Sequence, residues 1–232
     1  MKRIFQFLFV LLFASCINKV ESKVNVASSF NPIELDKNEL NIDANLLSDI
    51  KSDIKKKPIK LNREVWNYDK DGNEEHYFLN KGLVFKYVNE KKAHSVFNKY
   101  IDEVVKGNNY IFLTNMDFNE SFTSTYYDVI IIDGADPFDI IKRIGTNGIN
   151  YDIYNSDVIK TLKEWNDEVN FKFVVIDVSR IHAYMDKLPK NIKAFSKKVY
   201  AFCPDVIDQG YSSMDEMILD YKENKYFWLW WD

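Results

Sequence analysis

The chain has 232 residues, of which 46% are hydrophobic and 16% aromatic, so it carries enough apolar side chains to bury the core of one domain. Acidic residues outnumber basic ones by 35 to 31, which gives a formal net charge of −4. A surface that binds nucleic acid needs a basic excess to neutralise phosphates. The composition therefore predicts that nucleic acid is not a partner.

The first sixteen residues, "MKRIFQFLFVLLFASC", have the pattern of an export signal. Lys2 and Arg3 precede an apolar run that is far shorter than the ~20 residues of a membrane-spanning helix, and small residues follow it. The segment resembles the lipobox of bacterial lipoproteins, with Phe13 in place of the usual Leu. This resemblance implies a lipoprotein signal peptide over 1–15, acylation (palmitate) of Cys16, and a lipid anchor to a membrane of the bacterial cell envelope. The alternative is an ordinary secretory signal with an incidental Cys.

A change in composition divides the remaining chain. Phe30 is the one aromatic residue between Ile17 and Val65, and aromatic residues become frequent from Trp66 onward. We predict a tether over 16–60, with one short helix around Leu46 to Ile54, and a single globular domain over 61–232. The run Lys55 to Lys57 indicates a solvated linker, or at most a patch near anionic lipid headgroups.

In the first half of the domain the periodicities predict a hairpin, further strands and one helix. The stretch 65–79 predicts two strands around an Asp71-Gly72 turn. The spacing of Asp69, Asp71 and Asn73 also suits the start of a calcium loop, but the Gly and Glu of such a loop are not at their positions. A helix is predicted over 91–105, and strands are predicted over 83–88, 109–114 and 126–134.

The last part of the chain continues this alternation. We predict a helix over 156–169 capped by Asn155 or Ser156, a strand over 171–178, a helix over 191–203, and a helix after a Ser213–Glu216 capping box. The final stretch, "YFWLWWD", is apolar on both faces, which favours a central strand over an edge strand. The fold class that follows is α+β (mixed α/β), a sheet with packed helices and a central C-terminal strand.

Three segments resemble one bacterial family: "DPFDIIKRIGTNGINYDIYNSDVIKTLKEW", "YAFCPDVIDQGYSSMDEM" and "LWWD". In this order and spacing they are similar to the family catalogued as domain of unknown function 4253 (DUF4253), over about 136–232. The resemblance implies a mixed α and β fold and no reaction. Its matched positions, which are candidates for a ligand site or a structural motif, are Asn150, Cys203, Pro204, Asp205, Asp208, Gln209, Gly210, Trp230, Trp231 and Asp232.

Two functional hypotheses follow. The first is a non-enzymatic, membrane-anchored interaction module with an unidentified protein or small ligand as its partner. The second is a hydrolase or cation-dependent enzyme that uses Asp205, Asp208 and Asp232, since clustered carboxylates raise one another's pKa or recruit a cation. Turn and capping roles explain the same acids. Cys203 would need a base to act as a nucleophile, and the three histidines show no paired spacing, so no metal site and no cofactor are predicted.

Overall fold

The computed structural model describes residues 40–232, which belong to a compact unit spanning Leu35–Asp232 with a hydrophobic core of its own. The predicted signal peptide 1–15, the lipidation site Cys16 and most of the tether lie outside the described residues. In the range 40–232, none of the helices combines the length and the apolar character needed to cross a membrane.

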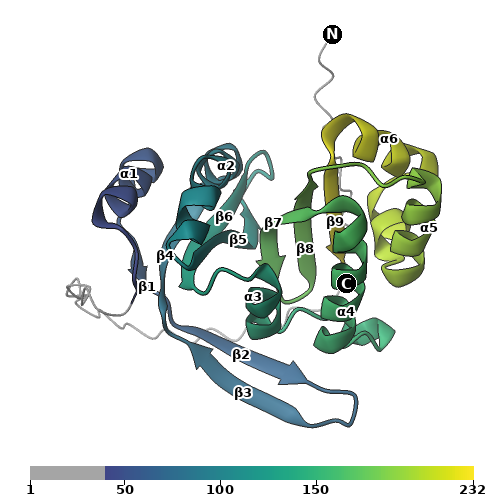
Figure 1. Ribbon diagram of the computed structural model, residues 1–232, viewed down its shortest axis with the longest axis horizontal. Helices are drawn as coiled ribbons and strands as arrows, with labels where there is room; N and C mark the ends of the chain where they lie inside the picture. Colours follow the sequence, from purple (N-terminus) through teal and green to yellow (C-terminus); the bar gives the residue numbers. More distant parts are fainter. Residues whose placement is uncertain (1–39) are drawn as a thin grey trace. The chain divides into compact units, whose positions relative to one another are not determined.

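A mixed seven-stranded sheet runs through the centre of this unit (Figure 1), which confirms the α+β class. All neighbouring strands are antiparallel except β5 and β7, which are parallel. In spatial order the strands are β1 (Ile59–Lys60), β4 (Gly82–Asn89), β6 (Thr125–Asp133), β5 (Asn109–Phe118), β7 (Phe171–Asp177), β8 (Arg180–Met185) and β9 (Tyr226–Trp230). The helical segments are α1 (Ala44–Ile54), α2 (Glu90–Lys106), α3 (Pro137–Ile144), η1 (Ile149–Tyr151), α4 (Asn155–Val169), α5 (Ile192–Phe202), η2 (Val206–Gly210) and α6 (Met214–Asn224).

Helix α2 packs on one face of the sheet through the stripe that its sequence predicts. The buried residues of this stripe are Ala93, Val96, Phe97, Tyr100, Ile101 and Val104. Helix α1 lies within the predicted tether and confirms the short helix expected there, but it packs on α2 as part of the compact unit. Ile50 and Ile54 are buried, and the Asp53 carboxylate accepts hydrogen bonds from Lys99 and Tyr100 of α2.

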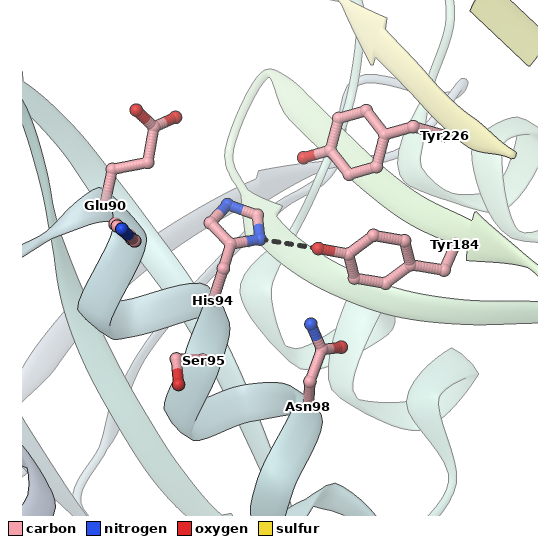
Figure 2. Close-up of a pocket in the computed structure, with 7 residues that line it drawn as sticks. Glu90, His94, Ser95, Asn98, Tyr184 and Tyr226 are labelled. Atoms are coloured by element: carbon pink, nitrogen blue, oxygen red, sulfur yellow. Dashed lines mark hydrogen bonds between the residues drawn. The ribbon is translucent and has the colours of Figure 1, made fainter. Parts of the chain in front are cut away.

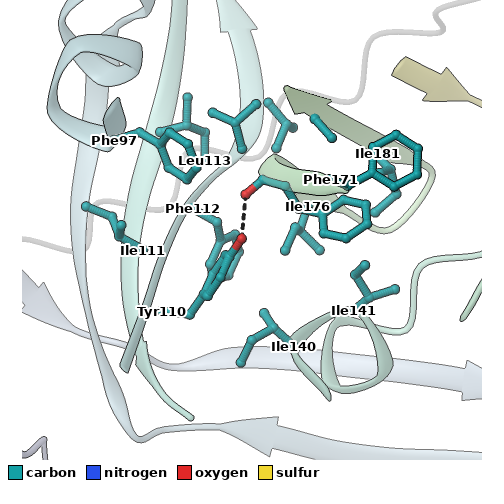
Figure 3. Packing of buried hydrophobic residues seen from close by; sticks show 14 of the residues in the cluster. Phe97, Tyr110, Ile111, Phe112, Leu113, Ile140, Ile141, Phe171, Ile176 and Ile181 are labelled. Atoms are coloured by element: carbon teal, nitrogen blue, oxygen red, sulfur yellow. Dashed lines mark hydrogen bonds between the residues drawn. The ribbon is translucent and has the colours of Figure 1, made fainter. Parts of the chain in front are cut away.

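Helices α4, α5 and α6 cover the opposite face of the sheet at its β9 end. The Phe227 ring of β9 contacts Trp165 of α4, Phe195 of α5 and Tyr221 of α6. Figure 3 shows the packed interior near β5 and β7, where the buried Tyr110 hydroxyl donates a 2.8 Å hydrogen bond to the Phe173 carbonyl. The buried phenol therefore has the hydrogen-bond partner that a buried polar group needs.

The final strand is at the edge of the sheet, so the prediction of a central position is wrong. Strand β9 pairs only with β8 in the sheet, and β8 was not predicted. The apolar residues of β9 tolerate this position because other elements cover its outer side. η2 and α6 contact β9, and the Cys203 sulfur hydrogen-bonds both the N–H and the carbonyl of Trp230. The edge is thus closed by the loop and helix that precede it.

Strands β2 (Arg63–Tyr68) and β3 (Glu74–Leu79) form the predicted hairpin, a separate two-stranded sheet seen below α3 in Figure 1. Its turn uses Gly72 at φ +80°. The Asp69 carboxylate accepts hydrogen bonds from the Asp71 and Asn73 backbone and from the Asn73 amide. This carboxylate therefore stabilises its own turn.

The start of α4 differs from the prediction that Asn155 or Ser156 caps it. The residue before the helix is Tyr154, whose N–H donates to the Asp157 carboxylate at 3.1 Å. Asn155 is buried, and its amide donates to the carbonyls of Ile141 and Thr146. Asn155 therefore joins α4 to the end of α3 instead of capping α4.

Candidate functional site

Asp205 is the centre of the matched C-terminal motif. Its side chain is buried and accepts three hydrogen bonds: Oδ1 from the Tyr151 hydroxyl at 2.5 Å and from the Gln209 amide at 3.0 Å, and Oδ2 from the Asp232 N–H at 3.0 Å. The bond to Asp205 raises the pKa of Tyr151 to about 12. Asp205 thus holds together η1, η2 and the residues after β9.

Two other matched residues are built into the same junction. The Asn150 amide donates to the main-chain oxygen of Asp232 at 2.6 Å. The Cys203 thiol is buried beside Trp230, and this burial raises its pKa to about 12. A thiol that stays protonated is a poor nucleophile. Its contacts with Trp230 give it a role at the edge of the sheet.

Two tryptophan rings of the C-terminal segment pack against glycines. A Cβ added to Gly210 would lie 2.1 Å from a ring carbon of Trp228, and one added to Gly148 would lie 2.6 Å from a ring carbon of Trp231. Both distances are far below carbon–carbon contact, so these rings pack directly on backbone. This packing gives a structural role to Trp228 and Trp231, two of the three tryptophans in "YFWLWWD".

The Asp205 and Asp208 carboxylates have different hydrogen-bond partners. Asp208 is exposed and accepts a 3.1 Å bond from Tyr200, whereas Asp205 is buried with different partners. Within residues 40–232, no group of three His, Cys, Asp or Glu side chains is placed to hold a metal ion. The contacts of Asp205 and of the residues around it are those of a structural junction.

A different set of side chains lines an open pocket of about 550 Å³ between α2 and the β8–β9 end of the sheet. Figure 2 shows Glu90, His94 and Tyr226 directed toward a common space, with Tyr184 below them. The complete lining is Glu90, Lys91, His94, Ser95, Asn98, Tyr184 and Tyr226. We call it the His–Tyr pocket.

Two histidine–tyrosine pairs organise the His–Tyr pocket. His94 Nδ1 lies 2.9 Å from the Tyr184 hydroxyl, and His182 Nδ1 lies 2.8 Å from the Tyr226 hydroxyl. The ring of Tyr226 contacts both imidazoles and the ring of Tyr184. These contacts fix the direction of each ring, which makes the pocket preorganised for a ligand.

Burial shifts the pKa values of several pocket groups toward their neutral forms. It lowers the pKa of His94, and it lowers that of His182 further, with added repulsion from Arg180 and His94. It raises the pKa of both Tyr184 and Tyr226. Partial burial also raises the pKa of the Glu90 carboxyl at the rim, although a hydrogen bond with Thr125 acts in the opposite direction. Groups with perturbed pKa values that converge in a pocket mark a candidate functional site.

A second cavity, of about 470 Å³, lies near β1 and the start of β2. Two of its cationic side chains are already paired. Arg63 forms a 2.7 Å ion pair with Asp177, and Lys86 forms a 2.7 Å ion pair with Asp128. Their charges are neutralised by the protein, so we favour the His–Tyr pocket as the ligand site.

The His–Tyr pocket was missed from the sequence, although parts of its pattern were visible. Glu90, His94 and Asn98 follow one another at intervals of four along α2, which places them on one side of the helix. His182 and Tyr184 alternate along β8 and share a face. The sequence does not show that these two rows face each other.

The two pocket histidines predict how stability depends on pH. Their pKa values are lower in the folded protein, so below about pH 6.5 the unfolded chain binds protons that the folded protein does not. The free energy of unfolding is therefore expected to fall as the pH is lowered through this value. Glu90 acts in the opposite direction, because its raised pKa makes the folded protein bind more protons just above the usual carboxyl range. Urea unfolding at pH values between about 7.5 and about 5.5 measures the net effect of these groups on the free energy of unfolding.

Matched variants test whether the imidazole of His182 causes this pH dependence. His182→Gln removes the imidazole with the larger shift and should reduce the loss of stability on acidification. His76→Gln removes an imidazole of the β2–β3 hairpin, outside the His–Tyr pocket, and serves as the control for the loss of one imidazole. An unchanged dependence in His182→Gln would contradict this account of the pocket.

Comparison with protein families gives one match, and comparison with the curated proteins and with the solved structures gives none. The matching region, residues 128–232, begins in β6 and includes β7, β8, β9 and the helices α3 to α6. It therefore contains Tyr184, Tyr226 and the Asp205 junction, whereas His94 and Glu90 precede it. In agreement with the predicted resemblance, residues 128–232 match the family described as "Domain of unknown function (DUF4253)".

Proposed function

We propose that this protein is a membrane-anchored lipoprotein of the bacterial cell envelope that acts as a non-enzymatic binding module, with the His–Tyr pocket as its ligand site. The observation that carries this proposal is that His94, Tyr184 and Tyr226 line one open pocket, with each tyrosine hydroxyl held by a histidine. The lipid anchor on Cys16 rests on the lipobox-like "FASC". Replacing Cys16→Ser should move the protein out of the membrane fraction, and its retention there would contradict the anchor.

The chemistry of the pocket favours an uncharged ligand that carries hydroxyl groups, such as a sugar. Burial favours the neutral forms of the His94 imidazole and of the Tyr184 and Tyr226 phenols that line it, and these groups donate and accept hydrogen bonds. The opposite charges of Glu90 and Lys91 balance at the rim. The rings of Tyr184 and Tyr226 offer apolar faces that the carbon face of a sugar ring can cover.

The test is the thermal midpoint of residues 35–232 with three classes of probe: neutral mono- and disaccharides, choline as a cation, and inorganic phosphate as an anion. A ligand that binds only the folded state raises the midpoint. For a domain of this size about 1 kcal/mol corresponds to ~2–4 °C. We expect a rise with a neutral saccharide and none with choline or phosphate.

The matched variants are Tyr184→Phe and Tyr200→Phe, each of which loses one phenolic hydrogen bond. Tyr184 lines the pocket, whereas Tyr200 is on α5 beside Asp208. The ligand-induced rise should be lost in Tyr184→Phe and kept in Tyr200→Phe. If no saccharide raises the midpoint, or if both variants respond as the wild type does, the His–Tyr pocket is not the ligand site.

The alternative of a hydrolase or cation-dependent enzyme that uses Asp205, Asp208 and Asp232 gains no support from their contacts. Both oxygens of Asp205 already accept hydrogen bonds from the protein, including one from the Asp232 backbone. A carboxylate that acts as a general base must lie within hydrogen-bond reach of the proton it takes up, and the three donors around Asp205 are all groups of the protein.

A further inference from the structure

The outer face of the β2–β3 hairpin is an exposed row of aromatic rings. Strand residues alternate between faces, and the side chains of the outer face, all of them exposed, are Glu64, Trp66, Tyr68, Glu74, His76 and Phe78. Opposite one another in the register are Glu64 and Phe78, Trp66 and His76, and Tyr68 and Glu74. Exposure reaches 47% for Trp66 and 51% for Phe78, which is high for rings of this size.

These rings are already arranged on one another. Trp66 stacks on His76 with 3.9 Å between centroids, and His76 meets Phe78 edge-on at 5.4 Å. His76 Nε2 lies 2.8 Å from Glu64 Oε1. A surface whose rings are ordered before binding loses little conformational freedom when a partner arrives.

The inner face of the hairpin holds it in place. Val65 and Leu79 are buried in the core, and the Tyr77 hydroxyl donates a 3.0 Å hydrogen bond to the Arg143 carbonyl at the end of α3. Lys70, near the turn, pairs with Asp157 of α4 at 2.6 Å. The hairpin is thus fixed on the domain while its outer face stays exposed.

The charges of the outer face identify the partner that it fits. Its six side chains include two glutamates and neither lysine nor arginine. Aromatic faces attract guanidinium and ammonium groups, and neighbouring carboxylates pair with them. We propose that the outer face of the β2–β3 hairpin binds an arginine- or lysine-bearing segment of a partner protein. This site is independent of the ligand proposed for the His–Tyr pocket.

The test uses residues 35–232 and fluorescently labelled peptides of alternating Arg and Thr, alternating Glu and Thr, and alternating Ser and Thr. Binding is measured by fluorescence anisotropy at physiological ionic strength. Under this condition charges are screened over ~8 Å, which limits long-range attraction. We expect the arginine peptide to bind at least about tenfold more tightly than the other two. Equal binding of the three peptides, or no binding of the arginine peptide, would overturn the proposal.

Matched variants separate this face from the overall acidity of the protein. Glu64→Lys with Glu74→Lys reverses both acids of the face, and Glu103→Lys with Glu223→Lys makes the same change of net charge at exposed positions elsewhere. We expect about a tenfold loss of arginine-peptide binding in the first pair and less than about twofold in the second. An equal loss in both pairs would contradict a specific site.

Two aromatic variants test the rings. Trp66→Ala and Phe78→Ser remove exposed side chains, and each should weaken binding of the arginine peptide about tenfold while the fold, measured by circular dichroism, is kept. Phe122→Ala removes a ring that is 68% exposed on the β5–β6 connection and serves as the control. If residues 35–232 instead form a dimer that Trp66→Ala dissociates, the face binds a second copy of the chain and the proposal is wrong.

Discussion

Trp231→Ala is expected to lower the free energy of unfolding by about 3–5 kcal/mol, the usual cost of removing a large aromatic side chain from a core. Trp231 is 2% exposed and packs on the Gly148 backbone. Its ring meets Phe202 edge-on, and its indole N–H donates to the Phe202 carbonyl at 3.4 Å. The substitution leaves a cavity at the junction of β9, α5 and η1. Denaturant unfolding of residues 35–232 measures the loss.

The control makes the same substitution at a tryptophan of the hairpin. Trp66 is 47% exposed, so Trp66→Ala removes less buried surface than Trp231→Ala and should cost clearly less. A similar loss in the two variants would contradict the structural role of Trp231. It would show that Trp231 of "YFWLWWD" does not stabilise the core at this end of the sheet.

Asp205→Asn is expected to cost about 1–3 kcal/mol, because all three partners of this buried carboxylate are donors. An asparagine has one acceptor oxygen, and its amide group would face at least one of these donors. The donor left without an acceptor near the buried junction destabilises the folded state. Denaturant midpoints, with the slope of the transition checked for two-state behaviour, give the value.

Asp208→Asn is the matched control in the same segment. Asp208 is exposed and has one bond, from Tyr200, so its substitution should change stability by no more than about 0.5 kcal/mol. If Asp208→Asn cost as much as Asp205→Asn, Asp208 would have a structural role that its single bond to Tyr200 does not explain. A large difference between them supports the structural interpretation of Asp205.

Local periodicity predicted most of the elements. The apolar stripe of α2 and the Asp71-Gly72 turn are properties of single segments, so the sequence is sufficient to find them. Strand β8 was missed because its apolar residues, Ile181, Ala183 and Met185, make a short alternation between polar neighbours. Strand β9 pairs with β8, and within residues 40–232 no strand lies on its other side in the sheet, so β9 is at the edge.

The candidate sites depend on contacts that no single segment encodes. Asp205 was recognised as a candidate, but its partners Tyr151 and Asp232 are distant in sequence. The His–Tyr pocket needs α2 to lie beside β8 and β9, a relation set by the order of strands in the sheet. Periodicity shows which residues share a face of one element, and tertiary packing decides which faces meet.

The central claim is that the His–Tyr pocket binds the ligand and that the Asp205 junction is architectural. Its most direct test is the change in backbone amide NMR shifts of residues 35–232 on addition of the saccharide that raises the thermal midpoint. We expect the shifted amides to cluster at 90–98, 182–184 and 226–228. Shifts concentrated at 150–151, 205–209 and 232 would contradict the claim and place the ligand at the Asp205 junction.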